Sequence, residues 1–188
     1  MSQAIQRNAQ LPMVRQPQFL HKADSLTPEL HRQPRSPLAV INAVADPQAL
    51  FGWRAEPLCS LEALYQREFS EGESVIIDFG SHCVGYLQFA CHSAGSPPDA
   101  PAHLQLTFGE TLCEVCEPFS DYRGWLSSSW LQQQDLWLDV LPAEVALPRR
   151  YCCRYVKIEV KAVSRKFRLR FDNLLLNTVT SAPEQCPP

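Results

Sequence analysis

The stretches Tyr155–Val163 (YVKIEVKAV) and Lys166–Phe171 (KFRLRF) show most directly which fold this 188-residue chain adopts. In the first stretch, Val156, Ile158 and Val160 alternate with charged side chains, and in the second, apolar residues alternate with arginines. Successive side chains of a β-strand point to opposite faces of its sheet. The pattern therefore predicts two strands, each with one buried face and one face in water.

The same period of two returns along most of the chain after residue 73. Ser74–Phe79 (SVIIDF) is a β-branched run that stops at a glycine, and both Gly85–Cys91 (GYLQFAC) and His103–Phe108 (HLQLTF) alternate. Seven or eight short strands without a long helical stripe predict an all-β fold, an antiparallel two-layer β-sandwich. The remaining candidate strands are Asp135–Val140, Glu144–Leu147 and Leu174–Val179.

The sequence indicates three parts. Residues 1–48 hold many of the prolines and glutamines and lack a sustained period, which predicts an extended or mobile leader with one strand near Leu38–Val44. Residues 49–182 carry the predicted β-sandwich domain, and residues 183–188 are a short tail. Inside the sandwich region, the apolar spacing of Leu58–Phe69 fits either a short helix or an irregular connection.

Composition and charge argue against several classes of partner. Lysine and arginine number 17 against 20 acidic residues, a formal net charge of −3, which disfavours nucleic acid or an anionic membrane. No apolar run approaches the roughly 20 residues that span a bilayer, and the N-terminal residues lack the apolar core of a secretory signal. We therefore expect a cytoplasmic chain whose 8 cysteines are reduced.

The cysteines form no recognisable cofactor site. Cys113 and Cys116 make a C-x-x-C, but a redox pair needs a strand-to-helix context and a zinc site needs two further ligands, and neither is visible. No histidine cluster accompanies the adjacent pair Cys152–Cys153. Because cysteine is also a small buried hydrophobe, we predict a structural role for these residues, with no metal and no cofactor.

The segment Glu110–Trp130 (ETLCEVCEPFSDYRGWLSSSW) is a long connection between two predicted strands, and long ordered loops are often functional. Its aromatic rings beside charged groups suit a sugar, whose C–H face stacks on a ring while its hydroxyls form hydrogen bonds. Alternatively, these aromatics close one end of the sandwich or pack against a neighbouring domain. The candidate site residues are Glu117, Asp121, Tyr122, Arg123, Trp125 and Trp130.

Several long motifs, in order, resemble one known family. They are Ile76–Phe89 (IIDFGSHCVGYLQF), His103–Glu110 (HLQLTFGE), Glu117–Gln132 (EPFSDYRGWLSSSWLQ), Leu138–Tyr151 (LDVLPAEVALPRRY) and Arg154–Val160 (RYVKIEV). Over about residues 50–182 the chain resembles the N-terminal region of bacterial α-L-rhamnosidase-like proteins, which belong to the six-hairpin glycosidase superfamily. This resemblance implies a sandwich of jelly-roll or galactose-binding type.

The resemblance also implies where the chemistry lies. In that family, carboxylates of a following (α/α)6 barrel act as general acid and base on a terminal rhamnose. No residue of this chain matches a barrel motif, so no catalytic residue is carried over. We therefore expect a non-catalytic accessory domain that binds a rhamnoside-type carbohydrate or docks on a glycosidase catalytic domain. The alternatives are a subunit or fragment of an active α-L-rhamnosidase, and a vestigial structural domain that self-associates through an exposed apolar patch.

Overall fold

The structure is a computed structural model that describes residues 16–125 and 127–182. The chain divides into two units, one that ends at Leu30 and one that begins at His31. The described part of the first unit holds helix α1 (Pro17–Ser25), which starts at a proline and buries none of its residues.

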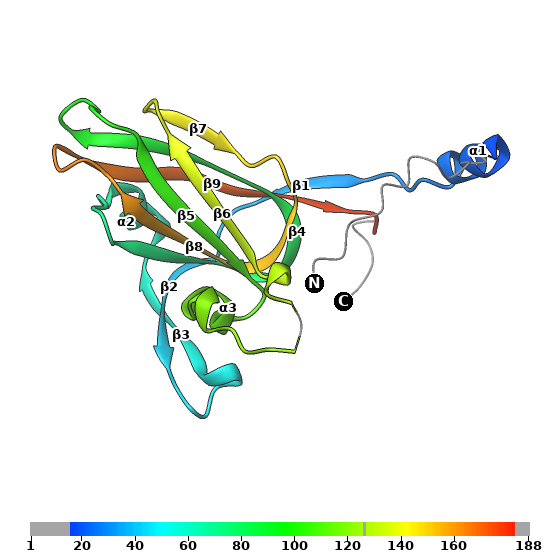
Figure 1. Cartoon of the computed structure of the whole chain (residues 1–188), viewed down its shortest axis with the longest axis horizontal. Coiled ribbons are helices and arrows are strands. Elements are labelled where there is room, and N and C mark those ends of the chain that lie inside the picture. Colours follow the sequence, from blue (N-terminus) through cyan, green and yellow to red (C-terminus); the bar gives the residue numbers. More distant parts are fainter. Residues whose placement is uncertain (1–15, 126, 183–188) are drawn as a thin grey trace, which may run out of the picture. The chain divides into compact units, whose positions relative to one another are not determined.

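Among the described residues, nine strands build the second unit, and all their pairings are antiparallel (Figure 1). Two short helices, α2 (Leu61–Gln66) and α3 (Leu112–Cys116), and three 3-10 turns, η2 (Leu50–Gly52), η3 (Phe119–Asp121) and η4 (Ser128–Trp130), connect them. The predicted all-β class is confirmed. The strands are β1 (His31–Arg35), β2 (Ala39–Ala45), β3 (Trp53–Cys59), β4 (Ser74–Gly95), β5 (Ala102–Gly109), β6 (Gln132–Leu138), β7 (Ala143–Ala146), β8 (Tyr151–Ala162) and β9 (Phe167–Thr180).

Strand β4 takes part in both layers of the sandwich. Its first part, Ser74–Asp78, pairs with β8 on one side and, from Ile76, with β2 on the other. Its last part, Gly85–Gly95, pairs with β9 on one side and, over Gln88–Cys91, with β7 on the other. One layer therefore has the order β3-β2-β4-β8-β5-β6 and the other the order β1-β9-β4-β7, which confirms the predicted two-layer sandwich.

The change of layer is made between Asp78 and Cys83, where the register of β4 against β8 shifts. Gly80 has a φ of 83°, in the left-handed region that favours glycine. The Asp78 carboxylate, only 5% exposed, accepts hydrogen bonds from the Gly80 amide at 2.6 Å and from Arg154 Nε and Nη2, both at 2.9 Å. A buried carboxylate is stable only when its oxygens are bonded in this way. The two strands predicted at 74–79 and 85–91 are thus one bent strand.

The core between the layers is filled by the residues that the alternation selects. Val156, Ile158 and Val160 of β8 are fully buried, and the apolar residues of the KFRLRF stretch in β9 are buried as well. All belong to one hydrophobic cluster together with the inward residues of β4 and β5. The alternation of charged and apolar residues therefore identified the buried face correctly.

A β-bulge explains why β9 looks like two strands in the sequence. Asn173 adopts a φ of 53°, and the register against β4 shifts by one residue at this point. The extra residue changes the phase of the alternation, so that Leu174 and Leu176 still face the core after Phe171. The stretches predicted at 166–171 and 174–179 therefore form the single strand β9.

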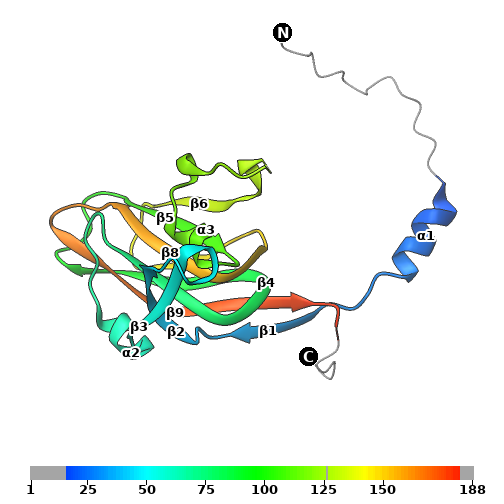
Figure 2. The same ribbon diagram turned by 90° about the horizontal axis from the view of Figure 1, so that it is seen from below.

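The sandwich begins at His31 rather than at residue 49, which corrects the predicted leader. Strand β1 pairs with β9 along its whole length, and the two run side by side in Figure 2. Sequence reasoning missed β1 (HRQPR) because it is a polar edge strand that contains a proline. The strand predicted near Leu38–Val44 is confirmed as β2. Residues 1–15 and the predicted tail 183–188 lie outside the described residues.

The two alternatives for Leu58–Phe69 resolve in favour of a short helix. Ser60 caps α2, because its hydroxyl accepts a hydrogen bond from the Ala63 amide at 3.2 Å. The helix buries Leu64, and Phe69 after it is buried against Phe171 of β9, with ring centroids 5.1 Å apart. This connection therefore closes part of the core.

The substitution Asp78→Ala tests the bend in β4. It removes three hydrogen bonds and leaves Arg154 without its carboxylate, so we expect a loss of about 2–4 kcal/mol in the free energy of unfolding. Urea denaturation followed by circular dichroism measures this loss. The matched control is Asp139→Ala at an exposed position, which should change the stability by less than about 0.5 kcal/mol. Equal effects of both substitutions would contradict the role given to Asp78.

Candidate functional site

The first half of Glu110–Trp130 is a helix that is anchored to the sandwich. Thr111 and Glu114 form a capping box at the start of α3. Leu112 and Val115 of the helix are buried in a small cluster with Tyr155 of β8 and residues of β2. In Figure 1, α3 lies beside β3 and the end of β5. The rest of the segment is irregular apart from η3 and η4, and residue 126 lies outside the described part.

A pocket of about 420 Å³ opens beside this segment. Its walls combine aromatic rings with glutamate side chains, the two kinds of group that the sequence indicated for a sugar site. The lining includes Phe51, Phe119, Tyr122, Trp130, Glu110 and Glu117.

Three of the six candidate residues therefore meet in one pocket, namely Glu117, Tyr122 and Trp130. The other three do not line it. Arg123 donates hydrogen bonds to the backbone oxygens of Ser120 and Tyr122, both at 2.9 Å, and so helps to hold its own segment.

The two remaining candidates, Asp121 and Trp125, are both exposed. Asp121 accepts a hydrogen bond from the Ser120 hydroxyl at 3.1 Å. Trp125 is 93% exposed and Trp130 is 72% exposed. Neither tryptophan of this segment is thus used to close the sandwich core, which was one of the three interpretations of the sequence.

Two residues at the site come from the β2–β3 hairpin, Phe51 from its turn and Trp53 from the start of β3, and both were missed in the sequence. Phe51, 63% exposed, has a φ of 54°, which is rare for a bulky residue. Trp53 donates a hydrogen bond from Nε1 to Glu117 Oε1 at 3.0 Å and so fixes that carboxylate. The sequence signal that could have found them is the run Phe51–Trp53 (FGW), which places two aromatics around a glycine.

The C-x-x-C pair lies in α3 and lacks the properties of a redox site. Burial raises the pKa of Cys116 to about 11, whereas a redox-active thiol has a lowered pKa. In the part of the chain that the structure describes, no group of three or more His, Cys, Asp or Glu is placed to hold a metal ion. No helix among the described residues is both long and apolar enough to cross a membrane.

Comparison with known families identifies the domain. Residues 37–178 match the model of the glycosyl hydrolase family 78 alpha-rhamnosidase N-terminal domain. The chain belongs to this family. The predicted resemblance is thereby confirmed, and the match begins within the region of β1 and β2, which agrees with a sandwich that starts before residue 49.

One solved structure is close to this rhamnosidase N-terminal domain. It is a rhamnosidase from Klebsiella oxytoca with rhamnose bound, at 72% identity and a TM-score of 0.88. The match covers 93% of this chain but 34% of that one, so the chain spans about a third of the length of the rhamnosidase. No curated protein sequence matches the chain.

Two further solved structures are more distant. The CBM32 of AlyQ in complex with 4,5-unsaturated mannuronic acid is 13% identical, with a TM-score of 0.43, and the match covers 77% of this chain and 97% of that one. A truncated AlyQ with CBM32 and alginate lyase domains is 12% identical, with a TM-score of 0.46, over 80% of this chain and 34% of that one.

The surroundings of the cysteines predict their reactivity. Burial raises the pKa of both Cys91 and Cys153 to about 12. At pH 8 the thiolate form of these two residues is rarer by a factor on the order of 1,000 than at an ordinary cysteine. Iodoacetamide labelling of the folded domain, read by mass spectrometry, should therefore modify the partly exposed Cys59 and leave Cys91 unmodified. Equal labelling of the two would contradict the structural role.

Proposed function

We propose that this domain is a non-catalytic accessory domain that docks on the catalytic domain of an α-rhamnosidase-type glycosidase. The docking surface that we propose is the aromatic end, defined here as Phe51 and Trp130, which line one pocket, together with Trp125 of the same loop segment. The observation that carries the proposal is the exposure of all three side chains, from 63% to 93%. Large aromatic residues are enriched at the energetic centres of protein interfaces and are costly to leave in water.

The partner follows from the comparison with the Klebsiella rhamnosidase. About two thirds of that protein lie outside the part that matches this chain. A domain so similar is therefore covalently joined to further structure in that enzyme, and the aromatic end offers a surface for such a neighbour. Each aromatic side chain removes roughly 150–250 Å² from water when it is covered, which favours a stable contact.

The rim of the aromatic end supports specificity. Glu117 is held by Trp53, and Glu110 lies 3.3 Å from the imidazole of His82, so both carboxylates have defined positions. Charged groups around an apolar centre select the orientation of a partner more than they raise its affinity. Because an isolated chain leaves its aromatic end in water, we also propose that it self-associates when no catalytic domain is present.

A second candidate function is carbohydrate binding in the pocket of Glu117, Tyr122 and Trp130. Its volume of about 420 Å³ is within the range of small-ligand sites. The carboxylate can accept hydrogen bonds from sugar hydroxyls while the rings stack on C–H groups. A rhamnoside-type carbohydrate is the ligand that this candidate implies.

The location of the chain is a further proposal. We infer a cytoplasmic location, because the seven cysteines of the described part are all free thiols, as is usual for proteins of a reducing compartment.

The accessory assignment predicts that the isolated chain has no glycosidase activity. Incubation with an aryl α-L-rhamnoside should release no more phenol than buffer does, because we assign no acid–base pair in this domain. A chromogenic assay over several hours measures this. Turnover that disappears in both Glu117→Gln and Asp121→Asn would show that the loop segment is catalytic and would overturn the proposal.

Docking predicts an association that depends on the aromatic end. The chain should bind the part of the Klebsiella rhamnosidase that lies outside the matched third, and Trp125→Ala combined with Trp130→Ala should weaken binding at least about 100-fold. Sedimentation velocity measures the complex, and circular dichroism checks that each protein is folded.

The matched variant is Trp137→Ala, because Trp137 is 64% exposed but lies on β6, away from the aromatic end. Binding that falls equally in this variant, or no binding between two folded proteins at 100-fold excess, would contradict docking through the aromatic end.

A further inference from the structure

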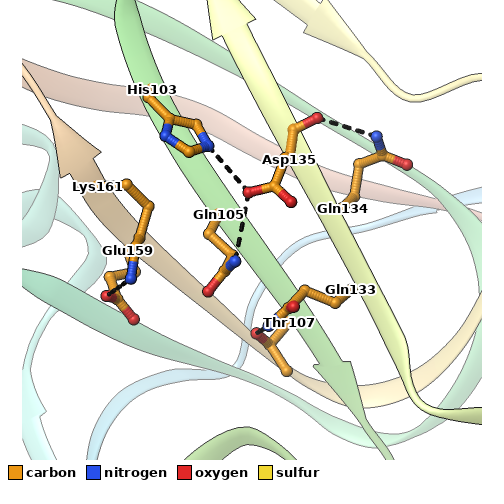
Figure 3. Close-up of polar contacts among 8 residues, drawn as sticks. All are labelled: His103, Gln105, Thr107, Gln133, Gln134, Asp135, Glu159 and Lys161. Atoms are coloured by element: carbon orange, nitrogen blue, oxygen red, sulfur yellow. Dashed lines mark hydrogen bonds and ion pairs between the residues drawn. The ribbon is translucent and has the colours of Figure 1, made fainter. Parts of the chain in front are cut away.

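The outer face of β6, β5 and β8 carries a second concentration of functional side chains (Figure 3). In the register of the sheet, Trp137 lies opposite His103, and Asp135 lies opposite Gln105. Gln105 in turn pairs with Glu159 of β8. Side chains two residues apart on one face of a strand are about 7 Å apart, so these residues form neighbouring rows. We name this face the sheet platform: Trp137, His103, Asp135, Gln105, Glu159 and Lys161.

The ring of Trp137 has a fixed orientation. It stacks on the imidazole of His103, with centroids 4.1 Å apart and planes 9° apart. The imidazole is itself held, because His103 Nε2 lies 2.9 Å from Asp135 Oδ1, which also accepts a hydrogen bond from Gln105 Nε2 at 3.3 Å. With one ring face on the imidazole and the residue 64% exposed, the opposite face of the indole is open to a ligand. Little conformational entropy remains to be lost when a ligand stacks there.

The charges of the platform cancel. Lys161 Nζ lies 2.8 Å from Glu159 Oε1, and Lys157 Nζ lies 3.3 Å from Glu159 Oε2. Together with Lys157, which neighbours the platform on β8, the strand side chains of this face carry two cations and two anions, a sum of 2 − 2 = 0 with the histidine neutral. A nucleic acid would require an excess of cations, and the centre of a protein interface is depleted of charged groups. A neutral ligand that both accepts and donates many hydrogen bonds fits this surface.

The platform is also hollowed at one end. A pocket of about 340 Å³ lies between the part of this face around Gln105 and Thr107 and residues 115–120. Gln105, Thr107, Gln133 and Lys157 line it from the strands, and Gln133 donates a hydrogen bond to the Thr107 hydroxyl at 3.3 Å. Amide, hydroxyl, ammonium and carboxylate groups thus continue from the tryptophan into a concave site, and the carboxylates are those of Glu159 and Glu117.

We propose that the sheet platform binds a neutral carbohydrate chain, with one sugar ring stacked on Trp137 and the following hydroxyls bonded to the amides and carboxylates between Asp135 and Glu159. None of the three residues of the aromatic end lines the hollow of this site. The hollow shares Glu117 and Phe119 with the loop pocket, whereas Trp137, His103 and Asp135 line neither of the two pockets. Three rows along the strands span roughly 14 Å, which is longer than one pyranose ring, so the site takes an oligosaccharide in preference to a monosaccharide.

Affinity electrophoresis of the complete chain tests this proposal. The probes are gels that contain neutral galactan, xylan or glucan and, separately, acidic polygalacturonate. At least one neutral polysaccharide should retard the chain, and Trp137→Ala should weaken the retardation about tenfold or more. Trp137→Phe keeps an aromatic ring and should retain part of the binding. Asp135→Asn, which weakens the support of His103, should give an intermediate loss.

Two further variants separate this site from the others. Trp130→Ala and Tyr122→Ala should leave the retardation unchanged, since these two residues line the loop pocket and do not line the hollow of the platform. Loss of binding in these variants with normal binding by Trp137→Ala would place the sugar in the loop pocket and overturn the proposal. Retardation of the chain by polygalacturonate alone would overturn the proposal as well. So would the absence of retardation by every neutral polysaccharide, provided that cooperative thermal unfolding shows that the chain is folded. Neither result bears on docking, which depends on a different surface.

Discussion

The bond between the Asp78 carboxylate and Arg154 holds the strand on which both layers depend. This ion pair lies where β4 passes from one layer to the other. The same carboxylate accepts a hydrogen bond from the backbone amide of Gly80, whose left-handed conformation makes the turn. Because β4 pairs with β2 and β8 before this point and with β9 and β7 after it, one bend sets the position of both layers. The hydrophobic core is enclosed only when the bend is made.

The first layer then determines where function can lie. Strand β5 is central in this respect, because its outer face carries His103 and Gln105 of the sheet platform and its end leads directly into α3 and the loop segment. The β2–β3 turn comes to the same end of the layer, where Trp53 binds Glu117 and Phe51 joins the pocket of Trp130. Two surfaces result, one apolar and aromatic and one polar with a single stacked tryptophan. The first is suited to a protein partner and the second to a sugar.

Much of the fold could be predicted from the sequence, because burial of one face imposes alternation on residues such as Val156 and Ile158. The continuity of β4 could not, since it depends on Arg154, which lies 76 residues from Asp78. The candidate site could be predicted in part, because the aromatic residue type of Trp130 in a long loop was enough to select it. Phe51 was missed because only folding of the β2–β3 hairpin places it there, and the sheet platform became visible only from the register of β5 and β6.

In the arrangement that we propose, a catalytic domain covers the aromatic end while the sheet platform stays open. Hydroxyl-radical footprinting of the four tryptophans, with and without the remainder of the Klebsiella rhamnosidase, tests it most directly. We expect Trp125 and Trp130 to lose their reactivity in the mixture while Trp137 remains as reactive as in the free chain. Protection of Trp137 with Trp125 and Trp130 still reactive would contradict it.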